Sequence, residues 1–315
     1  MKRIEEALEG VRSVAIAGHV DPDGDCIGST MALYLYITEN YPDIRTTVYL
    51  EHYKPNFAFI KGLDRSRPEL DASEEVDLLI LADISSISRI GVAGPLVDRT
   101  EKILCFDHHK TNTADFTWMH NHPDLCSTCE VVFGYLDAEK ISEHCAEALY
   151  MGLIHDSGLF RYESTSPETM EMAAFLMRKG IPFNRIVDNT FDQRTYDENR
   201  IIGKVLMESR LYADEKIVAA SVTKEEMDEY GVKPENLDAV VSELRKTAGV
   251  EVAVFIYWKQ PGIWKVSMRS KSQFDVSRVA VHFGGGGHIR AAGCNLRGPL
   301  EEIRTMVLRE IEAHL

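Results

Sequence analysis

Two segments of this chain, VDLLILAD at 76–83 and KILCFDHH at 102–109, are almost continuously apolar until acidic residues or histidines end them. A strand that is apolar on both sides must be covered on both faces, as strands are in parallel sheets between two layers. Residues 13–19 and 46–50 are similar short apolar runs, and apolar residues recur at helical spacing between the runs. Strands that alternate with helices predict an α/β domain with a mainly parallel sheet.

The pattern changes after a polar stretch, DNTFDQRTYDENR, which has few apolar residues and is typical of a linker. Beyond it, KIVAASVT and EVAVFIYWKQPGIWKVSMRSK predict strands, the second a hairpin that turns at Pro261 and Gly262. The chain is therefore predicted to contain a larger α/β domain, a linker and a smaller α+β domain, at 1–190, 191–205 and 206–315.

Composition excludes several classes of function. The net charge of -15 argues against a general electrostatic grip on long duplex DNA. No segment approaches the roughly 18 apolar residues of a membrane helix, so we expect a cytoplasmic protein with no membrane partner. A homodimer is compatible with the sequence.

Cys126 and Cys129 form a CxxC pair, but no second pair follows, and a helix start near Ser127 explains this stretch better than zinc.

Four segments place acidic residues and histidines where apolar runs end. GHVDPDGDCIGS at 18–29 has three carboxylates and one imidazole within seven residues, and Asp83, the DHH at 107–109 and the HDSG at 155–158 supply the rest. Ligands of open parallel sheets bind at the carboxyl ends of the strands, so we expect these segments to converge. Alternatively, the first segment is only a turn that caps a helix, with Asp25 as its N-cap.

Carboxylates mixed with a few imidazoles favour Mn²⁺ or Mg²⁺ over zinc. Two such ions about 3.5 to 4 Å apart activate a water and clamp a phosphoryl group. In this interpretation Gly24 provides a flexible turn that lets Asp23 and Asp25 face different ions.

The motifs HVDPDGD, LAD, DHH and HDSG, in this order, resemble those of the DHH phosphoesterase superfamily, and GGGGHIRAAG resembles the signature of its DHH-associated nucleic-acid-binding domain. The resemblance implies an active site in the cleft between the two domains and two Mn²⁺ ions, with Mg²⁺ or Co²⁺ as substitutes. It assigns His19, Asp23 and Asp83 to one ion, and it assigns the second ion to Asp25, Asp83, His108 and Asp156.

Two further residues of the DHH motif have implied catalytic roles. Asp107 would orient the imidazoles, and His109 would face the substrate phosphate or the leaving group, although His109 could instead support its loop. Asp21 and His155 match no ligand position, and a buried thiol at Cys26 fits where the family more often has a small residue.

The segment RSKSQFDVSRVAVHFGGGGHIR at 269–290 is locally basic in an acidic chain. Its four consecutive glycines allow backbone N–H groups to surround an anion, although a glycine hinge is the alternative. With the resemblance, the predicted substrate-binding residues are Arg269, Ser270, Gly285, Gly286, Gly287 and His288.

Within the superfamily, the length and the C-terminal motif are most similar to bacterial enzymes that degrade short oligoribonucleotides and dephosphorylate 3'-phosphoadenosine-5'-phosphate (pAp). The implied substrates are short single-stranded RNA, linear dinucleotides and pAp, with 5'-mononucleotides as products. The alternatives are a cyclic-dinucleotide phosphodiesterase, a family II inorganic pyrophosphatase, a RecJ-type exonuclease and a non-catalytic RNA-binding or nucleotide-binding protein.

Overall fold

The computed structural model describes residues 3–237 and 239–315, without the side chain of His288. The chain divides into two compact units, Met1–Gln193 and Arg194–Leu315. The α/β class, with a parallel sheet in the first unit and a separate mixed sheet in the second, is confirmed. The predicted position of the active site between the domains stays a prediction.

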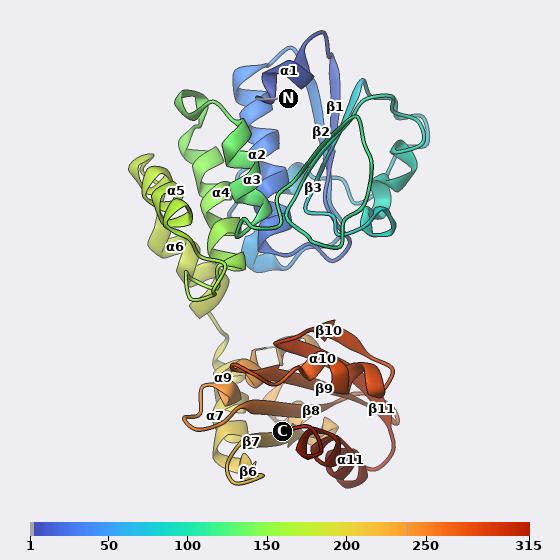
Figure 1. Ribbon diagram of the computed structural model, residues 1–315, viewed down its shortest axis with the longest axis vertical. Coiled ribbons are helices and arrows are strands. Elements are labelled where there is room, and N and C mark those ends of the chain that lie inside the picture. Colours follow the sequence, from blue (N-terminus) through green and yellow to red (C-terminus); the bar gives the residue numbers. More distant parts are fainter. Residues whose placement is uncertain (1–2, 238) are drawn as a thin grey trace. The chain divides into compact units, whose positions relative to one another are not determined.

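The first unit is built on a five-stranded parallel sheet in the order β2-β1-β3-β4-β5 (Figure 1). Four of its strands confirm predicted apolar runs, whereas β5 has only half-buried residues and was not predicted. The strands are β1 Ser13–Ala17, β2 Arg45–Tyr49, β3 Leu78–Ala82, β4 Ile103–Asp107 and β5 Trp118–Asn121.

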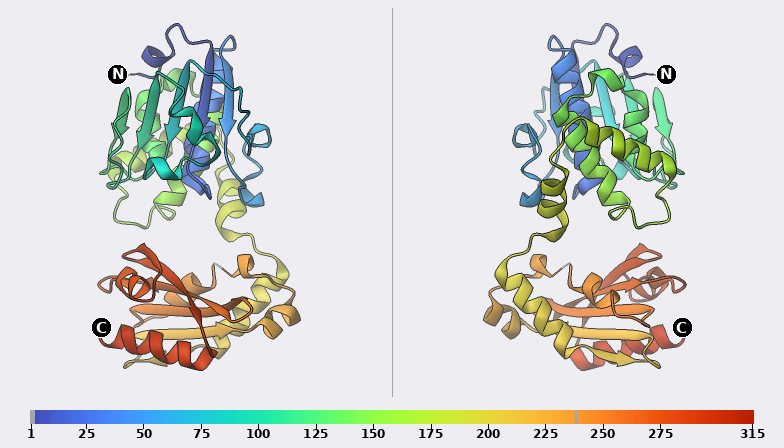
Figure 2. Two further views of the ribbon diagram at one scale, coloured as in Figure 1. Left: turned by 90° about the vertical axis from the view of Figure 1, so that its right-hand side faces the viewer. Right: turned by 90° about the vertical axis from the view of Figure 1, so that its left-hand side faces the viewer.

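Alternate residues of these strands enter two different hydrophobic clusters. Val14, Ile80 and Phe106 pack with the helices, while Ala15 and Leu81 pack on the opposite face with the short turns at 87–96. Helices α2 and α3 cover the first of these faces, and α4 packs on α2 (Figures 1 and 2). The helices of this unit are α1 Glu5–Leu8, α2 Gly24–Asn40, α3 Thr128–Tyr135, α4 Glu143–Asp156, α5 Pro167–Arg178 and α6 Phe183–Val187.

The second unit contains a six-stranded sheet in the order β10-β11-β9-β8-β7-β6, in which only β7 and β8 pair in parallel. The predicted hairpin joins β8 to β9, and Gly262 takes φ 72° at its turn. The strands are β6 Arg210–Tyr212, β7 Ile217–Val222, β8 Val252–Gln260, β9 Ile263–Ser270, β10 Gly286–His288 and β11 Ala291–Arg297.

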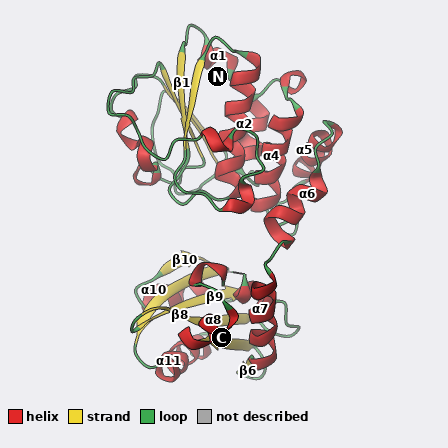
Figure 3. Ribbon diagram, turned by 180° about the vertical axis from the view of Figure 1, so that it is seen from behind, coloured by secondary structure: helices red, strands yellow, loops and turns green. Residues whose placement is uncertain are grey.

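Helices pack on both faces of this second sheet, α10 and α11 in one hydrophobic cluster and α7, α8 and α9 in the other (Figure 3). Much of the predicted linker 191–205 is in fact helical, because Thr195 and Glu198 form a capping box and three apolar residues of α7 are buried. The helices are α7 Tyr196–Glu208, α8 Lys224–Tyr230, α9 Val240–Arg245, α10 Val276–His282 and α11 Leu300–Glu312. Among the described helices, none has the length and apolarity that crossing a membrane demands.

Candidate metal centre

Three neighbouring strands of the first sheet lead into polar residues at the same edge. β1, β3 and β4 are adjacent and parallel, and they continue into His19, Asp83 and the DHH segment 107–109. The N–H of Asp83 donates to Phe106 O at 3.0 Å, which extends the pairing of β3 with β4 to the site. The start of α2 adds Asp23 and Asp25, and α4 ends at Asp156. The structure thus brings all six predicted ligands together.

Asp83 lies between two imidazoles. Its Oδ2 is 3.5 Å from His19 Nε2, and its Oδ1 is 3.8 Å from His108 Nε2. Asp23 Oδ1 lies 3.7 Å from His19, on the first side. Oδ2 thus faces His19, while Oδ1 faces His108 and, at 3.5 Å, His109 Nδ1. This arrangement would allow the carboxylate to bridge two ions.

The second side of Asp83 has two more carboxylates around His108. His108 Nε2 lies 3.1 Å from Asp156 Oδ2 and 3.9 Å from Asp25 Oδ2. One ligand atom from each of these three residues lies within 4.8 Å of the others. The residues that the family resemblance assigns to the two ions therefore lie on opposite sides of Asp83, and their roles as ligands stay predictions.

The orientation of the His19 ring also suits a metal ligand. His19 Nδ1 is 2.7 Å from Val20 O and 3.2 Å from Arg89 Nη2, so Nε2 is the ring nitrogen that faces Asp23 and Asp83. A backbone carbonyl that accepts the N–H of a ligating imidazole in this way fixes the orientation of the ring.

The clustered carboxylates strongly favour positively charged groups near them. Burial alone would lower the pKa values of His19 and His108, but the neighbouring carboxylates raise both to about 10. Burial and the charges of Asp83 and Asp156 raise the pKa of Asp25. Four clustered carboxylates need cations, and two divalent ions would balance their charge. The donor set of carboxylates and imidazoles fits two such ions.

Asp23 rather than Asp25 is the N-cap of α2, so the capping alternative had the wrong residue. Asp23 Oδ1 accepts the N–H groups of Asp25 and Cys26, both at 3.1 Å. Partial desolvation opposes ionisation of Asp23, whose side chain is 58% exposed, yet His19 and the N–H of Cys26 lower its pKa to about 2. Gly24 is needed for packing, because a Cβ there would lie 2.2 Å from Cγ of His155.

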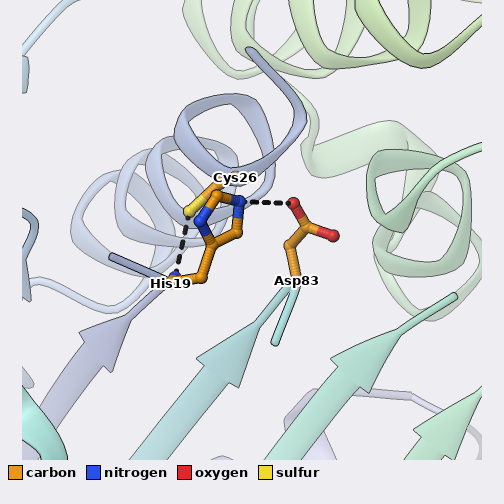
Figure 4. Close-up of side chains that lie close together, drawn as sticks. All are labelled: His19, Cys26 and Asp83. Carbon is orange, nitrogen blue, oxygen red and sulfur yellow. Dashed lines mark hydrogen bonds and ion pairs between the residues drawn. The ribbon is translucent and has the colours of Figure 1, made fainter. Parts of the chain in front are cut away.

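Cys26 lies beside His19 and Asp83 (Figure 4). Its Sγ is 3.3 Å from the backbone N of His19, which donates to it, and burial raises the thiol pKa well above its usual range. The protonated thiol therefore acts as a hydrogen-bond acceptor for the loop. Of the other cysteines, Cys126 and Cys129 are free and buried, and neither belongs to a candidate metal group among the described residues.

Asp107 and His109 lie beside the predicted ligands, and His109 Nδ1 is 3.5 Å from Asp83 Oδ1. Asp83, His108 and His109 also form a candidate metal group among the described residues. Asp107 is fully buried, and its Oδ1 accepts from His109 Nδ1 at 2.8 Å. This bond is the main cause of a raised pKa at His109. Asn112, which the sequence analysis missed, holds Asp107 in place by donating to Oδ2 at 2.7 Å and to Ile84 O. Asp107 thus orients His109, whereas His108 Nδ1 faces Leu125 O at 3.4 Å.

Asp21 and His155, which match no predicted ligand position, stay outside the candidate metal groups of the described residues. Asp21 is exposed, with φ 54°. The His155 ring packs between Phe57 and Phe191, with ring centroids 5.3 and 4.6 Å away, and burial lowers its pKa to about 4. His155 is therefore a neutral packing residue beneath the loop of α2.

Thr128, like Asn112, is a residue of this site that the sequence did not predict. Its hydroxyl donates to Asp83 Oδ1 at 3.0 Å, and its backbone N–H donates to Asp25 Oδ2 at 2.6 Å. Ser127 and Thr128 were interpreted only as a helix start, and nothing local in the sequence indicates a contact with residues so far away along the chain.

In the second unit, the predicted substrate-binding residues lie at the end of β9, in β10 and just before β10, and β11 separates these two strands. Arg269 and the backbone of His288 both pair with Ala291, from opposite sides of β11. The side chain of His288 lies outside the described part of the structure. Ser270 is fully buried, with its hydroxyl 3.4 Å from Ile289 O. The roles of all these residues in binding stay predictions.

Two of the glycines in the GGGG run are required by close packing on β11. A Cβ at Gly285 would lie 2.2 Å from Gly293 O, and a Cβ at Gly287, which has φ 140°, would lie 2.5 Å from Ala291 O. A Cβ at Gly286 would meet no atom of the described residues within 4 Å, so this position has room for solvent or a ligand. Close packing alone therefore explains why two of these positions are glycine, and no bound ligand is needed to account for them.

Glu251 organises the loop that follows β9 and was not predicted. Its Oε1 accepts the N–H groups of Ser272, Gln273 and Phe274 at 2.8 to 3.0 Å. Burial by itself would raise the pKa of Glu251, but these bonds lower it to about 2. An ionised carboxylate thereby fixes the start of the basic segment.

Comparison with known proteins agrees with this geometry. Residues 13–153 match the DHH family, N-terminal domain, and residues 214–313 match the DHHA1 domain. The chain therefore belongs to the DHH phosphoesterase superfamily and carries its DHHA1 domain.

Two curated relatives share most of their length with this chain. A protein of Thermus thermophilus named bifunctional oligoribonuclease and PAP phosphatase NrnA is 29% identical over the whole chain and 94% of that protein. A protein of the same name from Bacillus subtilis is 22% identical over 90% of this chain and 89% of its own. An exopolyphosphatase-related protein from Bacteroides fragilis has a similar structure, with a TM-score of 0.89 at 25% identity over 98% of this chain and 94% of that one.

Proposed function

We propose that this protein is a two-metal phosphoesterase that hydrolyses short oligoribonucleotides and linear dinucleotides to 5'-mononucleotides and removes the 3'-phosphate of pAp. The observation that carries the proposal is Asp83, whose two oxygens face two separate groups of ligands. The names of the relatives support the choice of substrates. Mn²⁺ is the proposed ion, with Mg²⁺ or Co²⁺ as substitutes.

Two sets of residues, which share Asp83, are the proposed ligands of the two ions. His19, Asp23 and Asp83 would hold one ion, and Asp25, Asp83, His108 and Asp156 would hold the second, since each set lies close together. When bound, the two ions supply an activated water and stabilise the charge of the phosphoryl group. The water gives up a proton to solvent as its oxygen bonds to phosphorus, the ester P–O bond breaks, and the leaving oxygen takes a proton from a general acid.

His109 is the proposed donor of that proton. Its Nδ1 is occupied by Asp107, so Nε2 is the ring nitrogen that can serve the leaving group. Asp107 favours the protonated imidazole and fixes the direction of the ring. Neither residue needs to touch a metal ion in this role.

The second unit would bind the phosphate or terminal nucleotide of the substrate. Arg269 contributes a cation, and the backbone N–H groups of Gly285, Gly286 and Gly287 would approach the anion, with Ser270 and His288 as further candidates. A small binding surface of this kind suits substrates a few nucleotides long, and a chain of net charge -15 does not favour long duplexes.

Gly286→Ala is expected to raise KM for pAp about tenfold, the loss of roughly one charge-assisted hydrogen bond. The fold has room for the methyl group, but a phosphate seated on the backbone does not. Steady-state kinetics and thermal unfolding would show a raised KM at an unchanged Tm. Gly203→Ala in α7 also meets no neighbour and is the matched control. An unchanged KM for Gly286→Ala would place the phosphate elsewhere.

The proposed activity is tested by incubating the protein with pAp, a five-nucleotide RNA, linear and cyclic di-AMP, and pyrophosphate, with Mn²⁺ or after EDTA. Chromatography should show Mn²⁺-dependent AMP from pAp and mononucleotides from the RNA. Turnover of pyrophosphate or cyclic di-AMP alone would instead indicate one of the alternative enzymes. Nucleotide binding without turnover of any substrate would indicate a non-catalytic protein.

A further inference from the structure

The N-terminus of α3 reaches directly under the candidate metal centre. The backbone N–H groups of Thr128 and Cys129 donate to the two oxygens of Asp25, at 2.6 and 2.9 Å. The Thr128 hydroxyl donates to Asp83 Oδ1 at 3.0 Å. All of these groups are buried. One residue therefore contacts two predicted ligands that come from different parts of the chain.

The first turn of α3 is arranged so that its free donors serve Asp25. Ser127 is the N-cap, and its hydroxyl accepts the N–H of Glu130 at 3.1 Å. The N–H groups of Thr128 and Cys129 have no acceptor within the helix, and Asp25 satisfies both. Two N–H donors and the positive end of a helix favour the ionised form of a carboxylate that is otherwise fully buried.

The contacts of Thr128 fall on one side of the centre. Asp83 Oδ1 is the oxygen on the side of His108 and His109, whereas Oδ2 faces His19. Asp25 also belongs to the His108 group, through its Oδ2 at 3.9 Å. The hydroxyl thus holds the bridging carboxylate by the oxygen on the His108 side.

We propose that Thr128 is a positioning residue that sets the affinity of the metal position formed by Asp25, Asp83, His108 and Asp156, separately from the position at His19. This inference rests on the proposed two-metal function. Residues that orient metal ligands through hydrogen bonds typically change metal affinity about 10- to 100-fold when they are replaced.

The test compares Thr128→Val with Thr128→Ser. Valine has nearly the shape of threonine and keeps the backbone N–H to Asp25, but it removes the hydroxyl, which serine retains. Calorimetric titration of the metal-free protein with Mn²⁺, without substrate, should show two binding steps in the wild type. In Thr128→Val one step should be unchanged and the other about tenfold weaker or more, and Thr128→Ser should restore it.

Electron paramagnetic resonance reports the same effect independently. At two equivalents of Mn²⁺, wild-type protein should show the broad signal of two coupled ions, and Thr128→Val should keep the six-line signal of a single bound ion. Because valine could act by weakening α3, Ser127→Ala is the matched control. It removes the N-cap bond to Glu130 and leaves the Thr128 hydroxyl on Asp83.

The outcomes separate the inference from the proposed function. Selective weakening of one step supports the role of Thr128 even if no nucleotide is hydrolysed. The role of Thr128 would be overturned if both steps weakened equally, if neither changed, or if Ser127→Ala caused the same loss. None of these results would contradict the proposed hydrolysis by the wild type. A wild-type protein that binds fewer than two ions would overturn both proposals.

Discussion

Asp83→Asn is expected to lower kcat/KM by about 10³-fold or more and to remove tight binding of both ions. Asp83 is the residue that faces both ligand groups, so the change affects both metal positions together. In the proposed mechanism the two ions would contribute several kcal/mol of charge stabilisation to the transition state, which corresponds to at least this loss in rate. Initial rates with pAp and a calorimetric Mn²⁺ titration would measure the two effects.

Asparagine is the appropriate replacement because the backbone of Asp83 has φ 60°. Asparagine adopts this left-handed region more readily than most residues, whereas alanine would add backbone strain to the loss of the ligand. Without metal, Asp83 repels Asp25 and Asp156 but attracts the protonated His19 and His108. Loss of its charge therefore has two opposing effects on the stability of the metal-free protein. The metal-free Tm should therefore change by no more than about 4 °C.

Metal-dependent stability gives the sharper measurement. At a concentration 100-fold above Kd, each ion stabilises the wild type by about 2.7 kcal/mol, or roughly 5 to 10 °C for a unit of this size. Asp83→Asn should lose this rise in Tm. Asp21→Asn is the matched control, since Asp21 has a similar φ of 54° but is exposed. A full Mn²⁺-dependent rise in Asp83→Asn would show that the carboxylate does not bridge two ions.

Much of the centre could be predicted because its ligands follow strands. Parallel strands end at one edge of a sheet, so His19, Asp83 and His108 converge once the strands are adjacent. The partners of the ligands could not be predicted in this way. Thr128 meets Asp25 across 103 residues of chain, and a helix start in the sequence indicates only local capping.

Glycines show the same limit of local inference. Gly24 was expected to provide flexibility, but it makes room for a ring that α4 contributes from 131 positions away. Gly285 and Gly287 were expected to face an anion, yet both are already required by the close approach of β11. A sequence shows where a side chain is missing, whereas only the tertiary packing shows which neighbour occupies the space.

His109→Gln is expected to lower kcat by about 10²- to 10⁴-fold, the usual contribution of a general acid. Both predicted metal groups keep all their ligands in this variant, so calorimetry should still show two Mn²⁺ ions bound. A substrate with a good leaving group, such as a nitrophenyl phosphoester, should be much less affected, because its leaving oxygen needs no proton. If kcat for pAp falls less than about twofold, His109 supports its loop and is not the acid.

Asp107→Asn tests the same role through its pH dependence. Asp107 raises the pKa of His109, and the protonated imidazole is the form that donates, so kcat should fall as pH rises through that pKa. Without the charge of Asp107 the pKa is lower, and the fall should therefore move to lower pH. The variant should lose more activity relative to wild type at pH 9 than at pH 6. An alkaline limb at the same pH in both proteins would mean that another group donates the proton, since Asp107 reaches the substrate only through His109.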